Sequence, residues 1–166
     1  MGGRSYSMIS IIIRMYNAAQ TLRAAVESAV HQTIPSEIIV IDDGSTDNGH
    51  EKIKDLIDNK KVKYIRQQNQ GAIKALNRGI KESKGEYVII LDADDQFEKT
   101  ILEELYNAIK TTNADFVYCD YYEETKGKRK IVSTQNMFSC IAGGVLIKKS
   151  LIAQLGAYRE DLNFPE

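Results

Sequence analysis

Acidic side chains gather in two short segments of the sequence, and carboxylates so close together suit the binding of a cation or of ligand hydroxyl groups. The first segment is Asp42-Asp43-Gly44-Ser45, and the second is Asp92-Ala93-Asp94-Asp95. Neighbouring carboxylates repel one another, so a protein that brings both segments together must neutralise them with a cation or with hydrogen bonds to a ligand. The two segments therefore predict a shared binding site.

The segment Asp92-Ala93-Asp94 suits a hard divalent cation. Alternate side chains of an extended chain point the same way, so one carboxylate can bind the metal while the other binds a nearby hydroxyl. A Mg²⁺ or Mn²⁺ ion held by one or two carboxylates completes its shell with water and substrate phosphates, which indicates a phosphorylated ligand. The alternative is that Asp94 or Asp95 only caps the following helix.

Two interpretations of the Asp42-Asp43-Gly44-Ser45 segment also remain open. A carboxylate beside a glycine turn can accept hydrogen bonds from a ring N–H group or a ribose hydroxyl. It can equally stabilise the turn and the start of the next helix. The sequence contains neither a Gly-x-Gly-x-x-Gly pattern nor a P-loop, so it does not predict a dinucleotide-binding or P-loop protein.

Short apolar runs alternate with amphipathic stretches, and this alternation predicts the elements that position the carboxylates. Five runs rich in Ile, Val, Tyr and Phe predict buried strands at residues 8–13, 37–41, 62–65, 87–91 and 115–119. Each intervening segment is long enough for a helical crossover between parallel strands. This indicates an α/β protein with a mostly parallel sheet and helices on both faces. In such a sheet ligands bind beyond the carboxyl ends of the strands, where both acidic segments fall.

Two departures from this alternation lie in the second half of the chain. A polar stretch at 120–135, with Gly127 in its centre, predicts a small β-hairpin insertion, and residues 148–155 predict a short helix that ends at Gly156. We expect residues 1–166 to form one domain. The net charge of −1 argues against a general nucleic-acid binder, which needs a basic excess.

Seven segments resemble, in order, the successive blocks of the family 2 glycosyltransferases, and together the resemblance covers roughly residues 8–166. These segments are Ile9–Asn17, Ser28–Thr33, Glu37–Asp47, Asn69-Gln70-Gly71, Asn77-Arg78-Gly79, Lys84–Tyr87 and Leu91–Asp95. The resemblance implies a GT-A (Rossmann-like) fold and an enzyme that transfers a sugar from a nucleotide-sugar donor, commonly UDP-linked, with inversion. It also implies a divalent cofactor, Mn²⁺ or Mg²⁺, and a saccharide or lipid-linked acceptor.

The same resemblance assigns roles to four residues of this chain. Tyr16 is expected beside the nucleotide base, Asp43 on the uracil and Asp92 near the ribose, while Asp94 is expected to bind the metal that bridges the two phosphates. The family often has Pro, then Thr or Ser, where this chain has Arg14 and Met15. Arg14 either reaches a donor phosphate or is simply tolerated at the rim, and we expect the latter.

A further departure concerns the general base, which in this family is the Asp of a Glu-Asp pair. The pair follows a Gly-Gly segment, here Gly143-Gly144, and a short helix, and Glu166 matches its Glu. The catalytic base is thus expected just after Glu166. We therefore expect a truncated domain, without its acceptor-binding part, that binds donor but transfers sugar poorly, since transfer needs a base within reach of the acceptor hydroxyl.

Two functions of other classes stay open. A phosphoacceptor receiver domain also carries an Asp pair and a later Asp around Mg²⁺, although here a complete strand–helix unit precedes the pair. A nucleotide-binding module without catalysis is the other alternative. No apolar run is long enough for a membrane helix, and the first residues are no secretory signal. We expect a cytoplasmic location, at the inner membrane face if missing parts of a longer protein make membrane contact.

Overall fold

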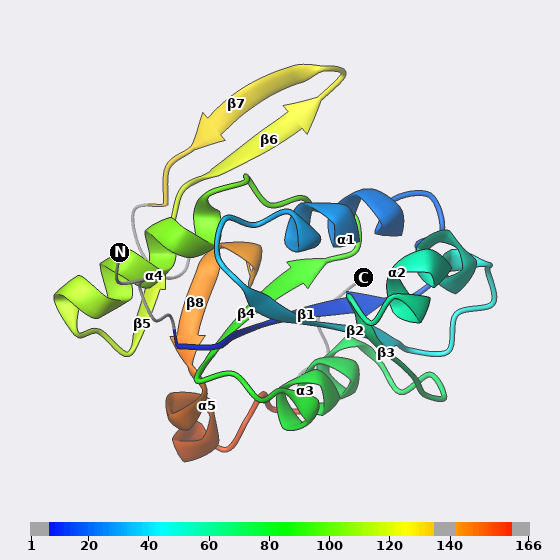
Figure 1. Cartoon of the computed structure of the whole chain (residues 1–166), viewed down its shortest axis with the longest axis horizontal. Helices are drawn as coiled ribbons and strands as arrows, with labels where there is room; N and C mark the ends of the chain where they lie inside the picture. The colour runs from blue at the N-terminus through cyan, green and yellow to red at the C-terminus, as the bar shows by residue number, and fades with distance from the viewer. Residues whose placement is uncertain (1–6, 135–141, 161–166) are drawn as a thin grey trace.

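A six-stranded sheet forms the centre of the computed structural model, which describes residues 7–134 and 142–160. The strand order is β3-β2-β1-β4-β8-β5 (Figure 1). The four parallel strands are β1 (Ile9–Met15), β2 (Ser36–Asp42), β3 (Lys63–Arg66) and β4 (Tyr87–Asp92). Strand β8 (Val145–Lys148) is antiparallel to both β4 and β5 (Phe116–Tyr118). The predicted α/β architecture with a mostly parallel sheet is confirmed.

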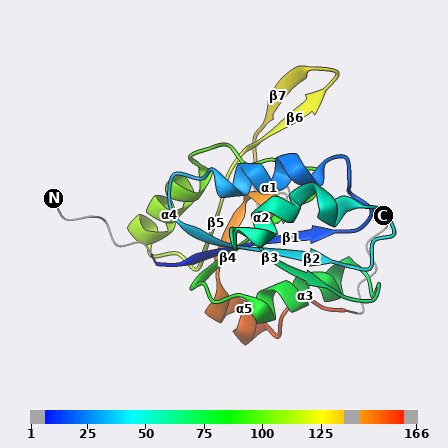
Figure 2. The same ribbon diagram turned by 45° about the vertical axis from the view of Figure 1, so that its right-hand side comes forward.

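Helices cover both faces of this sheet, as Figure 2 shows. One face carries α1 (Leu22–Val30), α4 (Ile101–Thr112) and α2 (Lys54–Asp58), which continues a 3₁₀ turn over Gly49–Ile53. The other carries α3 (Ala72–Glu82) and α5 (Lys149–Leu155). Side chains of β1 alternate between the two layers: Ile11 and Ile13 pack on the α1 side, while Ile12 packs on the α3 side. None of the helices in the described ranges is long and apolar enough to cross a bilayer.

Helix α3 lies unusually close to β1 because Gly79 has no side chain. A Cβ atom at Gly79 would lie 2.4 Å from Cγ2 of Ile12 and 3.3 Å from Cγ1 of Ile41. Any larger residue would therefore push the helix away from the sheet or displace these two buried isoleucines.

The predicted hairpin is confirmed as β6 (Tyr121–Thr125) and β7 (Lys128–Val132), which project from the body of the molecule (Figure 1). Lys126 and Gly127 form its turn, with φ angles of 52° and 72°. Positive φ at both central residues is typical of the type I′ turn that joins two-stranded hairpins.

Strand β8 is the element that the sequence pattern does not predict. It inserts between β4 and β5, so β5 has no direct hydrogen-bond ladder with β4. Its four residues pass directly into α5, and this merges their apolar pattern with that of the helix. The predicted C-terminal helix itself is confirmed, and it ends at Gly156 with a φ of 85°.

Candidate donor-binding site

The two acidic segments lie at the same edge of the sheet, on either side of the central strand β1. Arg14 of β1 pairs in register with Asp92 of β4, and the next residue, Met15, pairs with Asp42 of β2. Since neighbouring strands are about 4.8 Å apart, Asp42 and Asp92 lie on the order of 10 Å from each other. The predicted convergence of the two segments is thus what the strand register produces.

Asp43 is built into the fold, with 4% of its surface exposed. Its Oδ1 accepts hydrogen bonds from Gln67 Nε2 (2.7 Å) and the Gln70 N–H (3.0 Å), and its Oδ2 accepts one from the Gly71 N–H (2.8 Å). Helix α3 begins directly after Gly71, so the carboxylate satisfies amides at the positive end of that helix. Oδ2 accepts one described bond and retains a lone pair for a ligand donor.

The turn after Asp43 requires a glycine. Gly44 has a φ of 78°, and a Cβ atom there would lie 2.7 Å from the backbone nitrogen of Asn69. The loops after β2 and β3 can therefore touch only because position 44 lacks a side chain. This contact brings Gln67 and Gln70 within reach of Asp43.

Asp42 holds the turn rather than facing the crevice, with 1% of its surface exposed. It accepts hydrogen bonds from the Ser45 N–H (2.8 Å) and the Tyr64 hydroxyl (2.5 Å), and the Arg66 Nε lies 3.9 Å away. Burial is the largest influence on its pKa and raises it, but hydrogen bonds from Tyr64 and Ser45 and the charge of Arg66 together bring the pKa below the ordinary value. The turn-stabilising interpretation therefore applies to Asp42.

Asn17 links the loop after β1 to the loop after β2. It has a left-handed φ of 51°; its N–H donates to Ser45 Oγ (3.0 Å), and its Oδ1 accepts from the Thr46 N–H (2.8 Å). Asn adopts this conformation more readily than most residues. Tyr16, directly before Asn17, is half exposed at the end of β1. Asn17 falls within a family-like block of the sequence, but the sequence alone assigns it no role.

The expectation that Arg14 is simply tolerated at the rim is wrong, because the side chain forms an ion pair. Its Nε donates to Asp92 Oδ1 at 2.6 Å, and the two side chains are 29% and 30% exposed. The hydrogen bond with Asp92 raises the pKa of Arg14, burial opposes this, and the charges of Asp92 and Asp94 add to the increase. The guanidinium thus neutralises one of the acidic groups after β4.

The acidic groups after Asp92 remain poorly compensated. Asp94 and Asp95 are exposed, and burial together with repulsion from Asp94 and Asp92 raises the pKa of Asp95. The residue before α4 is Thr100, without a side-chain cap, so neither Asp94 nor Asp95 caps that helix. Within residues 7–134 and 142–160, no three His, Cys, Asp or Glu side chains are arranged to hold a metal ion by themselves. These carboxylates fit a hard cation that one or two of them hold together with ligand phosphates.

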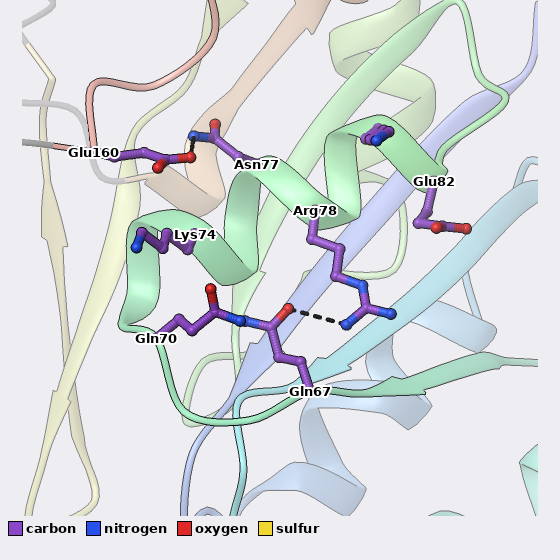
Figure 3. Close-up of a pocket in the computed structure, with 8 residues that line it drawn as sticks. Gln67, Gln70, Lys74, Asn77, Arg78, Glu82 and Glu160 are labelled. Atoms are coloured by element: carbon purple, nitrogen blue, oxygen red, sulfur yellow. Dashed lines mark hydrogen bonds between the residues drawn. The ribbon is translucent and has the colours of Figure 1, made fainter.

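A pocket of about 560 Å³ lies along α3, and Gln67 and Gln70, which both bond to Asp43, are among the residues that line it (Figure 3). Arg78 Nη1 donates to Gln67 Oε1 (3.3 Å), and Gln67 in turn donates to Asp43, so the pocket wall and the buried carboxylate form one network. Sequence reasoning gave Gln67 and Arg78 no role, although the Asn77-Arg78-Gly79 block marked the region.

The segment after α5 closes one end of this pocket. Asn77 Nδ2 donates to the Tyr158 carbonyl (2.8 Å) and to Glu160 Oε1 (3.3 Å, Figure 3), and the Tyr158 N–H donates back to Asn77 Oδ1 (3.0 Å). The expected base follows Glu166, and residues 161–166 lie outside the described residues.

Comparison with known proteins identifies the family. The family model described as "Glycosyl transferase family 2" matches residues 10–162. The chain belongs to this family. This membership excludes the receiver-domain alternative.

Individual relatives agree with this assignment. A cholesterol galactosyltransferase of Borreliella burgdorferi is 44% identical over 117 residues, which are 69% of this chain and 32% of that protein. Glycosyltransferase GlyG of Streptococcus pneumoniae is 40% identical over 119 residues, or 69% of this chain and 39% of that protein. The matched part of this chain therefore spans less than half of the length of either relative.

Solved structures show the same GT-A fold. S. aureus TarS in complex with UDP-GlcNAc superposes with a TM-score of 0.75 at 21% identity, covering 95% of this chain and 48% of that chain. A Pyrobaculum calidifontis mannosyltransferase in complex with GDP-Man and Mn²⁺ gives a TM-score of 0.78 at 18% identity, covering 95% and 49%. Identities this low establish a shared fold and no shared substrate.

Proposed function

We propose that this glycosyltransferase binds a nucleoside-diphosphate sugar at the carboxyl ends of β1, β2 and β4 and takes part in metal-assisted, inverting transfer. One observation carries the proposal: the register of these strands brings Asp43 and the Arg14–Asp92 pair to one edge, with Asp94 next to them. Structures of the same fold that hold UDP-GlcNAc, or GDP-Man with Mn²⁺, support a nucleotide sugar as the donor.

Each residue in the crevice suits one part of such a donor. The half-exposed ring of Tyr16 can stack on the base, and the free lone pair of Asp43 Oδ2 can accept from a ring N–H group of uracil. Asp92, held by Arg14, presents its second oxygen to a ribose hydroxyl. Asp94 would hold Mn²⁺ or Mg²⁺, which when bound neutralises charge that grows on the leaving diphosphate.

Inversion requires the acceptor hydroxyl to attack the anomeric carbon from the side opposite the leaving nucleoside diphosphate. A base within hydrogen-bond reach must take the hydroxyl proton. The assignment of that base to a residue just after Glu166 stays a prediction, as does the poor transfer expected of this chain. The acceptor class, saccharide or lipid-linked, and the cytoplasmic location likewise stay predictions.

Titration calorimetry with UDP, with and without Mn²⁺, tests the proposal. We expect Mn²⁺ to strengthen UDP binding by about tenfold or more, because it screens the repulsion between the diphosphate and the acidic segment. Asp94→Asn should remove this gain, and metal-free binding should not weaken but strengthen slightly, because one charge that repels the diphosphate is gone. The exposed Asp58→Asn, in α2, is the matched control and should behave as the wild type. Binding that does not respond to Mn²⁺, or binding of neither UDP nor GDP, would contradict the proposal.

A further inference from the structure

Arg14 occupies the centre of the proposed site with most of its hydrogen-bonding capacity unused. A guanidinium has five N–H donors in a fixed fork. Its Nε donates to Asp92, whereas its two terminal nitrogens donate to no acceptor among residues 7–134 and 142–160. The ion pair fixes the position of the fork, and both partners are about one-third exposed at the rim.

Other arginines of the chain use their terminal nitrogens within the protein. The terminal nitrogens of the following four arginines contact a described carbonyl, amide or carboxylate oxygen: Arg23, Arg66, Arg78 and Arg129. Arg14 differs from these in that its terminal nitrogens have no such partner within the described ranges. An arginine held by Nε and open at its fork is arranged to bind an anion.

We propose that the terminal nitrogens of Arg14 bind a phosphate oxygen of the donor diphosphate while its Nε holds Asp92. This inference rests on the proposed function, since it assigns a phosphate-binding residue within the same site. Arg14 is a permanent cation beside Asp92 and Asp94. It therefore gives nucleoside diphosphates an affinity that does not depend on a divalent ion, in addition to the contribution of the metal.

Comparison of UDP with uridine in EDTA isolates this contact, because only UDP carries the phosphates. Charge-assisted hydrogen bonds of this kind correspond to roughly 10- to 100-fold in affinity. We expect the wild type to bind UDP that much more tightly than uridine, and Arg14→Gln to bind both alike. Arg14→Lys keeps the charge but cannot hold Asp92 and offer a fork together, so it should retain only part of the preference. Arg23→Gln is the control on α1 and should match the wild type.

The outcomes separate the two proposals. If Arg14→Gln loses UDP and uridine binding equally, or loses neither, Arg14 only positions Asp92 and the inference is overturned. The proposed function would still stand in that case, provided that UDP binding depends on Mn²⁺. If the wild type binds neither UDP nor GDP in any condition, both proposals are overturned. If Arg14→Gln does not fold, Arg14→Lys and the salt dependence of wild-type UDP binding decide: a preference for UDP that KCl does not weaken contradicts a phosphate contact.

Discussion

The acidic segments after β2 and β4 look alike in sequence, yet the fold treats them in opposite ways. The carboxylates of Asp42 and Asp43 are buried and accept hydrogen bonds from the surrounding loops. Asp94 and Asp95 are exposed and repel each other, and of the carboxylates described in the segment Asp92-Ala93-Asp94-Asp95 only Asp92 forms an ion pair, with Arg14. The first segment stabilises the loops that form the edge of the sheet, while the second keeps charge that the described residues do not neutralise.

The largest expected effect is on folding, from Asp42→Ala. This change leaves the Ser45 N–H and the Tyr64 hydroxyl without their buried acceptor, so we expect the free energy of unfolding to fall by roughly 3 kcal/mol. Urea denaturation measures it. Asp92→Ala is the matched change in the other segment and should cost less than about 1 kcal/mol, because its ion pair is partly exposed. If both variants lost a similar amount of unfolding free energy, the two segments would not differ in their structural role.

Asp43→Asn should affect both folding and binding. Asn keeps one acceptor oxygen, so either the two bonds to Oδ1 from Gln67 and Gln70 or the one bond to Oδ2 from Gly71 lose their acceptor. We therefore expect a loss of about 1–2 kcal/mol in the free energy of unfolding. Because Asp43 is proposed to contact the base, uridine and UDP should weaken by the same factor, measured by calorimetry. A loss confined to UDP would instead assign Asp43 to the phosphates.

Asp94→Asn should change binding alone. We expect the gain in UDP affinity on adding Mn²⁺ to disappear while the urea midpoint stays at or slightly above that of the wild type, since one repelling charge is removed. A clear fall in the midpoint would place Asp94 in the structural group with Asp42.

The two segments should also respond oppositely to acid. The pKa of Asp42 is lowered in the folded state, so its stabilising contribution is present above about pH 3.9, the unfolded value, and is lost as the pH falls through the folded pKa. The pKa of Asp95 is raised, so its charge destabilises the fold above the raised pKa and this penalty disappears on acidification.

Unfolding curves of the wild type, Asp42→Asn and Asp95→Asn between pH 2.5 and 7 measure this smallest effect (roughly the range over which carboxyl groups titrate). The difference between wild type and Asp42→Asn should shrink toward low pH. The slight advantage expected of Asp95→Asn at neutral pH should also vanish there. Parallel curves for all three proteins would contradict both directions.

The strands of the central sheet can be predicted from the sequence, because the spacing of apolar residues along the chain determines which segments form buried strands. The buried runs that form β1, β2 and β4, and the Lys126-Gly127 turn, are local signals. The crevice at their ends follows from parallel pairing alone. The roles of Tyr16 and Asp94 come from family resemblance, and binding experiments are needed to test them.

What the sequence misses depends on contacts between distant segments. The Arg14–Asp92 pair joins positions 78 residues apart and exists because β1 and β4 pair in one particular register. The Arg78–Gln67–Asp43 network likewise needs the α3 position. Strand β8 pairs with β4 although roughly 50 residues lie between the two strands in the chain. Its four residues are too few to show a hydrophobic period that predicts a strand.

The contact between Gly79 and Ile12 has a consequence for the energetics of ligand capture. A helix seated this closely on the central strand has no room to slide, so the first turn of α3 and the Asp43 carboxylate that it meets are held in one arrangement. The crevice wall is preorganised during folding, so a nucleotide bound there as proposed would need to immobilise little besides itself and the exposed side chains at the rim.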